Sequence, residues 1–230
     1  MPRTKTILFV LTSHDRLGDT AETTGFYVAE AAHPWQVFTD AGHRVRMLSP
    51  RGGPAPRTGA DRSDPAQRAF LDDPDVAAAL AATLTSDQVD PADYDAIFFV
   101  GGHGTMWDFP GNEALARIAA AIHVSGGVVS AVCHGPAGLL DVVLPDGRRL
   151  VEGRQVAAFT NSEENAVGRT HIVPFLLQTA LEERGAKHSA APDFAPHVVV
   201  DERLVTGQNP ASATGVAEAV VRILAAGDSR

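Results

Sequence analysis

The stretch VVSAVCHGPAGLL, residues 128–140, decides the fold of this chain and contains its only cysteine, Cys133. An apolar run rich in β-branched residues enters it, and Gly135 and Pro136 follow soon after the cysteine. This order predicts a buried strand, a sharp turn and the start of a helix. It is the geometry of a nucleophile elbow, here with Cys in place of Ser. Two interpretations stay open: a nucleophile whose thiolate a helix N-terminus favours, or a small buried apolar residue.

The residues far upstream predict a β-α-β unit. Residues 6–11 form a continuous apolar run, as expected of a strand buried on both faces. A helix in two parts is predicted between Gly25 and Gly42, with Pro34 opening the second part. Residues 45–48 form the next strand, so the two strands are expected to be parallel with a right-handed connection.

Strands and helices continue to alternate along the chain, which predicts an α/β fold: a doubly wound, mostly parallel sheet sandwiched by helices. Residues 1–230 are expected to form one domain, in which residues 50–75 make a small cap at the sheet edge. Further strands are predicted over 94–100, 156–159, 198–200 and 204–206, and helices from Asn112, over 173–181 and from Asn209-Pro210.

The composition narrows the classes of partner. The 230 residues are 44% hydrophobic and 20% charged, which is ordinary for a globular protein. A formal net charge of −9 argues against nucleic acid or an anionic membrane as partner, because phosphates require a basic surface. The apolar run 7–11 is too short for a signal peptide core, and no run reaches membrane-spanning length. A single cysteine permits no internal disulfide, so a cytoplasmic location is expected.

Three buried strands are predicted to end next to residues that carry chemistry. One precedes the loop leading to Glu30, one precedes the GGHG sequence of residues 101–104, and one precedes Cys133. Sites in such folds lie beyond the carboxyl ends of the strands, so these residues are expected to converge. The GGHG sequence lacks the spacing of a dinucleotide fingerprint. It is either a tight turn or half of an oxyanion hole built from the N–H groups of Gly102 and His134.

Acid–base groups can also be named, each with a simpler alternative. His134 could exchange protons near neutral pH, or it could face solvent. Glu163 and Glu164 could orient its imidazole, or they could only complement a helix dipole. Glu30 lies in an otherwise apolar segment, where it is either a proton shuttle with a raised pKa or part of a solvated helix face.

The histidines do not form a metal-binding motif. His33, His43, Asp40 and His103 lack the spacing of known metal ligand sets, and there is no Cys-x-x-Cys or His-x-x-x-His pattern. The sequence therefore predicts no metal site.

Several segments resemble one known family. Residues 131–137 (AVCHGPA) resemble the elbow of the ThiJ/PfpI superfamily, the class I glutamine amidotransferase-like proteins, which implies a flavodoxin-like fold. Residues 101–110 (GGHGTMWDFP), 159–164 (FTNSEE) and 204–212 (LVTGQNPAS) are similar to its heat-shock-chaperone branch, which includes glutathione-independent glyoxalases (glyoxalase III, D-lactate dehydratase). The resemblance covers nearly the whole chain.

The resemblance implies a role for each matching residue. Cys133 corresponds to the nucleophile, with a low pKa, and His134 to its neighbour. Glu164 corresponds to the acidic member of the triad, and Glu30 to a buried glutamate in contact with the cysteine. The amides of Gly102 and His134 correspond to the oxyanion hole, and Gly101 and His103 are expected to bind substrate.

The resemblance also implies an activity. Cys133 would add to methylglyoxal or glyoxal, a small 2-oxoaldehyde substrate, and release lactate or glycolate without a cofactor; a homodimer is expected. A protein deglycase would use the same chemistry. The alternatives are a holdase-type stress chaperone and a PfpI-like cysteine peptidase or amidase. A glutaminase subunit is disfavoured, because it requires a synthetase partner and an ammonia channel.

Overall fold

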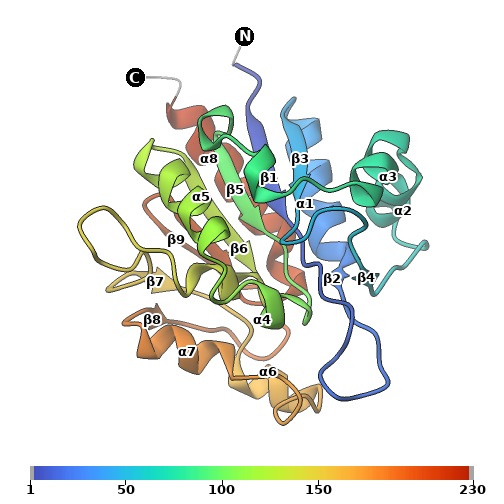
Figure 1. The fold of residues 1–230 in the computed structure, drawn as a ribbon, viewed down its shortest axis with the longest axis vertical. Coiled ribbons are helices and arrows are strands. Elements are labelled where there is room, and N and C mark those ends of the chain that lie inside the picture. The colour runs from blue at the N-terminus through green and yellow to red at the C-terminus, as the bar shows by residue number, and fades with distance from the viewer. Residues whose placement is uncertain (1–2, 228–230) are drawn as a thin grey trace.

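A six-stranded sheet forms the centre of the protein, in a computed structural model that describes residues 3–227. All neighbouring strands run parallel except β9 and β10, which are antiparallel at one edge. The predicted mostly parallel, doubly wound α/β fold is therefore confirmed (Figure 1). The order across the sheet is β3 (Arg44–Leu48), β1 (Thr6–Val10), β5 (Ala96–Phe99), β6 (Val128–Val132), β10 (Leu204–Gly207) and β9 (Val198–Asp201).

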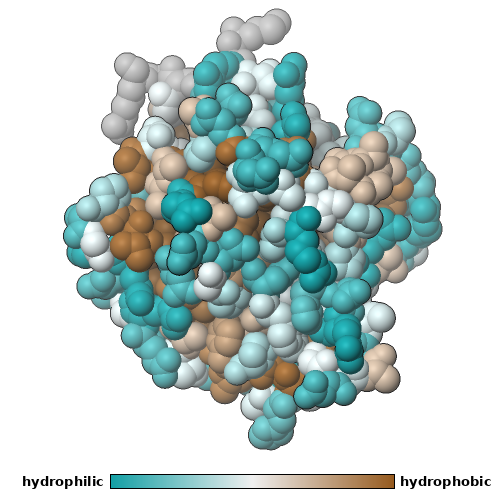
Figure 2. Space-filling view, in the orientation of Figure 1, coloured by the Kyte–Doolittle hydropathy of each residue, from teal (hydrophilic) through white to brown (hydrophobic). Residues whose placement is uncertain are grey.

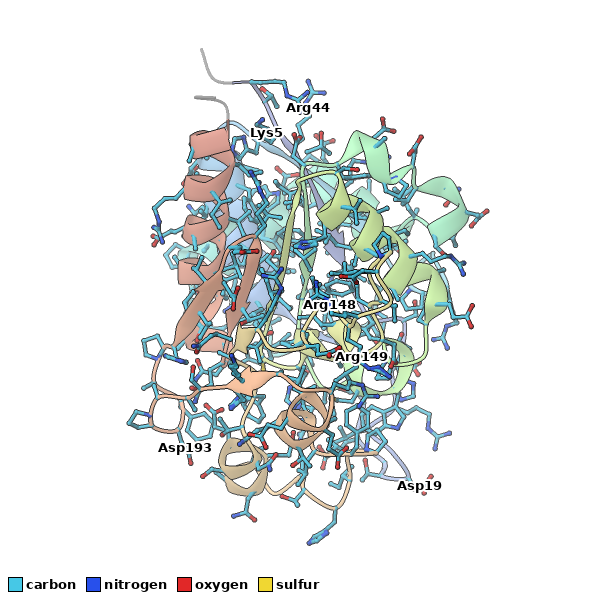
Figure 3. The ribbon with its side chains drawn as sticks, turned by 90° about the vertical axis from the view of Figure 1, so that its left-hand side faces the viewer. Lys5, Asp19, Arg44, Arg148, Arg149 and Asp193 are labelled. Carbon is cyan, nitrogen blue, oxygen red and sulfur yellow. The ribbon has the colours of Figure 1, made fainter. Side chains whose placement is uncertain are left out.

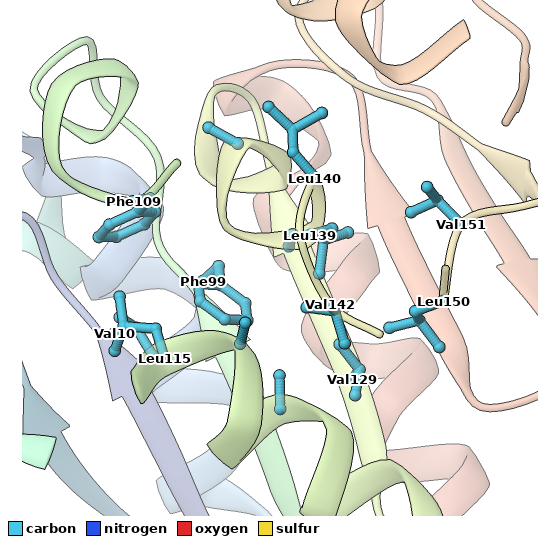
Figure 4. Packing of buried hydrophobic residues seen from close by; sticks show 14 of the residues in the cluster. Val10, Phe99, Phe109, Leu115, Val129, Leu139, Leu140, Val142, Leu150 and Val151 are labelled. Atoms are coloured by element: carbon cyan, nitrogen blue, oxygen red, sulfur yellow. The ribbon is translucent and has the colours of Figure 1, made fainter. Parts of the chain in front are cut away.

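Two hydrophobic clusters cover the two faces of this sheet. Along β5, Phe99 contributes to one cluster and Phe98 to the other, as alternation along a strand requires. The first cluster includes residues of α5 (Glu113–Val124) and α7 (Leu177–Glu183), and Figure 4 shows Phe99 packed among Val10, Phe109 and Leu115. The second includes residues of α1 (Val28–Asp40), α2 (Pro65–Asp72), α3 (Pro74–Ala81) and α8 (Ala213–Gly227).

Short elements link the main helices and strands. Two small parallel sheets lie outside the central one, β2 (Phe26–Tyr27) with β4 (Arg57–Thr58) and β7 (Gln155–Val156) with β8 (Lys187–His188). The remaining helical elements are η1 (Ser86–Gln88), η2 (Pro91–Asp93), α4 (Thr105–Asp108), η3 (Gly135–Leu139), α6 (Asn161–Ala166) and η4 (Pro210–Ser212).

The helix predicted in two parts is one continuous helix, so the predicted break at Pro34 is wrong. Pro34 lies buried inside α1, whose packing against α2 and α8 offsets the hydrogen bond that proline removes. Phe26 and Tyr27 are not helical, because they pair with Arg57 and Thr58 of the following excursion. Tertiary contacts outweigh the local signals here.

Three other predicted bounds also shift. The strand expected over 156–159 is limited to Gln155–Val156, and the helix expected from residue 173 begins at Leu177. The last helix begins with the separate turn η4, and α8 starts at Ala213.

Residues 50–75 run beside α1 at the edge of the sheet. The Asp64 side chain caps α2 by accepting hydrogen bonds from the N–H groups of Ala66 and Gln67. His33 Nε2 of α1 lies 2.7 Å from Oδ2 of the same aspartate. The cap of α2 thus also attaches the excursion to α1.

The loops at the carboxyl ends of the strands gather at one end of the molecule. Figure 3 shows Asp19 and Asp193 at that end, whereas Lys5 and Arg44 lie at the opposite end. The loop after β1 and helix α6 both extend there (Figure 1). No helix within residues 3–227 combines the length and the apolar character needed to cross a lipid bilayer.

Candidate active site

Cys133 occupies a sharp turn directly after β6. Its φ of 60° is unusual for a residue with a side chain, and the surrounding backbone fixes it. Its N–H donates to the carbonyl of Gly207 at 2.9 Å, and its carbonyl accepts from the N–H of Phe159 at 2.9 Å. Only glycine fits at position 135, two residues further on, because a Cβ on Gly135 would lie 2.2 Å from the carbonyl oxygen of Phe99. The predicted elbow is confirmed.

The predicted low pKa of the Cys133 thiol is not supported by this environment. Burial raises the pKa of Cys133, and the neighbouring Glu30 side chain raises it further. The helix that follows is the five-residue 3-10 turn η3, too short to supply a sizeable dipole. The thiolate therefore has to form by proton transfer to a neighbouring base.

His134 provides that base. Its Nδ1 lies 3.3 Å from Sγ of Cys133, and its Nε2 lies 2.7 Å from Oε2 of Glu164. A carboxylate only accepts hydrogen bonds, so Nε2 carries the proton and Nδ1 is free to accept the thiol proton. The ring is buried against Phe159, with the ring centroids 4.5 Å apart. The alternative of a solvent-facing His134 is wrong.

The two neighbouring glutamates have different environments. Glu163 forms the capping box of α6 with Thr160 and accepts hydrogen bonds from Asn209 and from the N–H of Phe194. Glu164 points to the histidines instead. Burial opposes its ionisation, but hydrogen bonds from His103 and His134 lower the pKa of Glu164 to about 2. Glu164, as the resemblance implied, is the carboxylate beside His134.

His103 is a second partner of the same carboxylate. Its Nε2 lies 2.9 Å from Oε1 of Glu164, and its ring centroid is 4.1 Å from that of His134. Burial and the proximity of His134 lower the pKa of His103 to about 4, so the ring is neutral at pH 7. Arg169 Nη1 lies 3.3 Å from Nδ1, which identifies Nδ1 as the acceptor and Nε2 as the donor to Glu164. No sequence pattern indicated this hydrogen bond.

Glu30 is completely buried in the first turn of α1, so a solvated helix face is excluded. Burial raises the pKa of Glu30 to about 8, against smaller lowering contributions from Cys133 and the backbone of Gly101. Neither carboxyl oxygen has a hydrogen bond of standard geometry within residues 3–227. Glu30 is therefore protonated at neutral pH and can donate a proton to its surroundings.

The two glycines after β5 make room for this arrangement. A Cβ at Gly101 would lie 2.3 Å from Oε2 of Glu30 and 2.9 Å from the backbone nitrogen of His134. Gly102 has a φ of 109°, and a Cβ there would lie 2.4 Å from the carbonyl oxygen of Gly25. Gly101 sits behind the site, so only Gly102 and His103 of this loop line the cavity. Gly101 was expected to bind substrate, but it does not line the cavity.

A cavity of about 370 Å³ opens onto these groups. Glu30, Gly102, His103, Cys133 and His134 line it, so residues from three strand ends converge as predicted, and Glu164 lies behind the histidines. The other lining residues come from scattered segments and were not predicted as site residues, although Phe159 and Pro210 lie in segments that resemble the family: Tyr27, Thr58, Phe159, Val167, Arg169, Phe194 and Pro210.

One group of side chains within residues 3–227 could hold a metal ion. His103, His134 and Glu164 offer ligand atoms that all lie within 4.8 Å of one another. Two imidazoles and a carboxylate suit zinc, but each Nε2 already donates a proton to Glu164. A metal ion bound at this position would have to displace the Nε2 protons of His103 and His134. His33 is bonded to Asp64 instead.

Comparisons with known proteins agree on one family. The model of the DJ-1/PfpI family matches residues 22–223. The glutathione-independent glyoxalase HSP31 of Saccharomyces cerevisiae is 36% identical, over 93% of this chain and 95% of its own. The crystal structure of glyoxalase III from Candida albicans has a TM-score of 0.88 at 31% identity, covering 95% of this chain and 97% of that one. Rapid Encystment Protein of Francisella tularensis has a TM-score of 0.92 at 37% identity, covering 96% and 99%.

Proposed function

The chain belongs to the DJ-1/PfpI family, and we propose that it is a glutathione-independent glyoxalase that converts methylglyoxal to lactate and glyoxal to glycolate without a cofactor. One observation supports this above all: His134 lies between Cys133 and Glu164, beside a cavity suited to a small molecule. The curated relatives that match nearly the full chain are named for the same activity.

The first step uses Cys133 as the nucleophile. His134 Nδ1 takes the thiol proton, and the sulfur adds to the aldehyde carbon to give a hemithioacetal. The N–H groups of Gly102 and His134 stabilise the negative charge that develops on oxygen. One such donor contributes about 3 kcal/mol to transition-state stabilisation.

The second step moves a proton between the two substrate carbons. The former aldehyde carbon loses its proton, an enediol forms, and the adjacent carbon is protonated, so that a thioester results without any external oxidant. Glu30, which is protonated at neutral pH, or the protonated His134 first gives its proton to the hemithioacetal oxygen. The base formed in this way accepts the proton from the former aldehyde carbon and returns it to the adjacent carbon. Water then hydrolyses the thioester and releases the hydroxy acid. General acid–base help of this kind is worth about 10²–10⁴-fold in rate.

Direct product measurement tests the proposal. The purified protein is incubated with methylglyoxal, and D-lactate is quantified for wild type, Cys133→Ala and His134→Asn. A matched control is His171→Asn, because His171 is exposed and lies outside the cavity. We expect lactate from wild type and the control only. Absence of lactate from wild type, or equal lactate from Cys133→Ala, contradicts the proposal.

The competing functions make different demands on the surface. A holdase needs a large exposed apolar patch, whereas hydrophilic residues cover much of the face in Figure 2. Undiminished suppression of aggregation by Cys133→Ala would support a holdase, and cleavage of a peptide panel would support a peptidase. Release of free amines from glycated protein would identify a deglycase. The large apolar side chains exposed within residues 3–227 are Val124, Val143, Val167, Phe194 and Val200.

We also propose that residues 1–230 form a single domain, that two chains form a homodimer, and that the protein works in the cytoplasm. Packing of α2 against α1 supports the first point, since it joins the excursion at 50–75 to the main core. The resemblance to the family supports the other two. Limited proteolysis and light scattering test the domain and the dimer, and cell fractionation tests the location.

A further inference from the structure

A cationic side chain lies in the active-site cavity with part of its hydrogen-bonding capacity unused. Arg169 follows α6 and lines the cavity together with Cys133 and His103. Its guanidinium offers five N–H donors and stays charged at any physiological pH. Within residues 3–227 its hydrogen bonds are one from Nη1 to His103 and one from Nη2 to Glu22. Three N–H donors are left for a ligand or water.

We propose that Arg169 makes the cavity selective for 2-oxoaldehydes that carry a carboxylate at the end remote from the aldehyde. The inference rests on the proposed function and names its substrate class. The aldehyde would meet Cys133, and the carboxylate would form paired hydrogen bonds with the guanidinium, the geometry that Arg and carboxylates favour. The conversion itself is unchanged: one C–H proton moves between the two carbonyl carbons, water is added, and nothing is oxidised from outside.

Glu22 does not saturate Arg169. Its Oε2 lies 3.3 Å from Nη2, and its side chain is 63% exposed, against 29% for Arg169. Ion pairs this exposed contribute little free energy, so a carboxylate inside the cavity can compete with Glu22. The pair joins the loop after β1 to the segment after α6, at the end of the molecule where the two meet (Figure 1).

The residues that line the cavity place no ionised acidic side chain against Arg169. Glu30 is completely buried, and this burial raises its pKa to about 8, so it carries no negative charge at pH 7. Glu164 is ionised, but each of its oxygens accepts a hydrogen bond from a histidine, and it does not line the cavity. An anionic ligand therefore meets one full positive charge and no exposed negative charge among the described lining residues.

The shape of the cavity also fits a substrate longer than methylglyoxal. Its volume of about 370 Å³ falls in the range of about 300–1,000 Å³ typical of pockets for small-molecule ligands, which leaves room for a chain longer than that of methylglyoxal. Phe159, Val167 and Phe194 form an apolar wall suited to a short carbon chain. Phe194 has a φ of 62°, which the bond from its N–H to Glu163 Oε1 helps to hold, so this wall has a defined position.

The test compares two probes that differ only at the remote end: 4,5-dioxopentanoate, which ends in a carboxylate, and 2-oxopentanal, which ends in a methyl group. We expect kcat/KM of the wild type to be about 10- to 100-fold higher for the carboxylate probe, as charge-assisted hydrogen bonds allow. The preference should fall as ionic strength rises, because screening weakens the attraction. In Arg169→Met the ratio should approach one, mainly through KM of the carboxylate probe.

Two further variants keep the test decisive if Arg169→Met fails to fold. Glu22→Gln removes the competing carboxylate and should raise the preference by up to about fivefold. Arg222→Met, an exposed substitution on α8, should leave the ratio unchanged. Equal kcat/KM for both probes in wild type overturns the inference while leaving the glyoxalase proposal intact. Failure to convert any 2-oxoaldehyde overturns the proposed function instead. In that case, Arg169-dependent binding of 2-hydroxyglutarate, the expected product, to Cys133→Ala would still support the anion site, and its absence would contradict it.

Discussion

Nε2 of His134 lies 2.7 Å from Oε2 of Glu164, although the two residues are 30 positions apart in the chain. This contact fixes the tautomer of His134 and turns its free nitrogen toward Cys133. His103 donates to the other oxygen of the same carboxylate, so Glu164 holds two imidazoles at once. The reactivity of the cysteine therefore depends on a carboxylate that does not touch it.

Glu164→Gln should inactivate the protein without unfolding it. The amide cannot accept hydrogen bonds from both histidines, so the tautomer of His134 is no longer fixed. We expect kcat for methylglyoxal to fall about 10²–10⁴-fold. Circular dichroism melting provides the check on folding.

Glu163→Gln is the matched control for that change. It disturbs buried hydrogen bonds to Thr160, Asn209 and Phe194, so the free energy of unfolding should fall by about 1–3 kcal/mol. The folded fraction should lose far less kcat than Glu164→Gln does. Equal losses of kcat in the two folded variants would contradict the separate roles given to these glutamates.

Glu30 should make the stability of the protein fall as pH rises. The folded state keeps the Glu30 proton up to about pH 8, whereas an unfolded chain releases it near 4.5. Between these values the folded state binds more protons, so raising the pH favours unfolding. The glutamine in Glu30→Gln does not titrate. The free energy of unfolding of this variant minus that of wild type should therefore increase by about 2–3 kcal/mol from about pH 5 to about pH 7.

Urea denaturation at a series of pH values measures this difference. The comparison between the two proteins removes the contributions of all other titrating groups. A constant difference across the series would show that the pKa of Glu30 is not raised.

Gly101→Ala should disrupt the site by steric conflict alone. Its added Cβ would lie 2.3 Å from Oε2 of Glu30, and also 2.5 Å from the carbonyl oxygen of Val132 and 2.9 Å from the backbone nitrogen of His134, which cannot move aside as a side chain can. We expect a loss of about 1–3 kcal/mol in stability, typical of overpacking, together with lower kcat. Gly215→Ala in α8 is the control, because its nearest contact is the end of the Val198 side chain at 3.1 Å. Thermal melts of equal midpoint for the two variants would argue against the conflict.

Chelation should leave the activity unchanged, because every proposed step uses side chains and water. Added Zn²⁺ should inhibit, because an ion bound to His103, His134 and Glu164 would displace the protons on the two Nε2 atoms. Inhibition should weaken in His103→Gln, which removes one ligand. The measurements are kcat/KM after dialysis against EDTA and a zinc titration of both proteins. Loss of activity on chelation would instead indicate a metal in the reaction.

The sequence by itself determined the sheet and the elbow. Continuous apolar runs predicted β1, β5 and β6, because strands covered on both faces need no polar positions. Gly135 and Pro136 after Cys133 predicted the turn, because few residues allow the chain to reverse so closely against a neighbouring strand. These are local properties, and the residues themselves carry them.

Only the tertiary structure decided the charge states of the site residues and the contacts of His103 and Arg169. The sequence predicted a low pKa for Cys133, but burial beside Glu30 raises it. It indicated His103 as a site residue but not the hydrogen bond from His103 to Glu164, and it did not indicate that Arg169 belongs to the site. A pKa depends on desolvation and on neighbouring charges in three dimensions, and the chain brings those neighbours together from distant segments only when it folds.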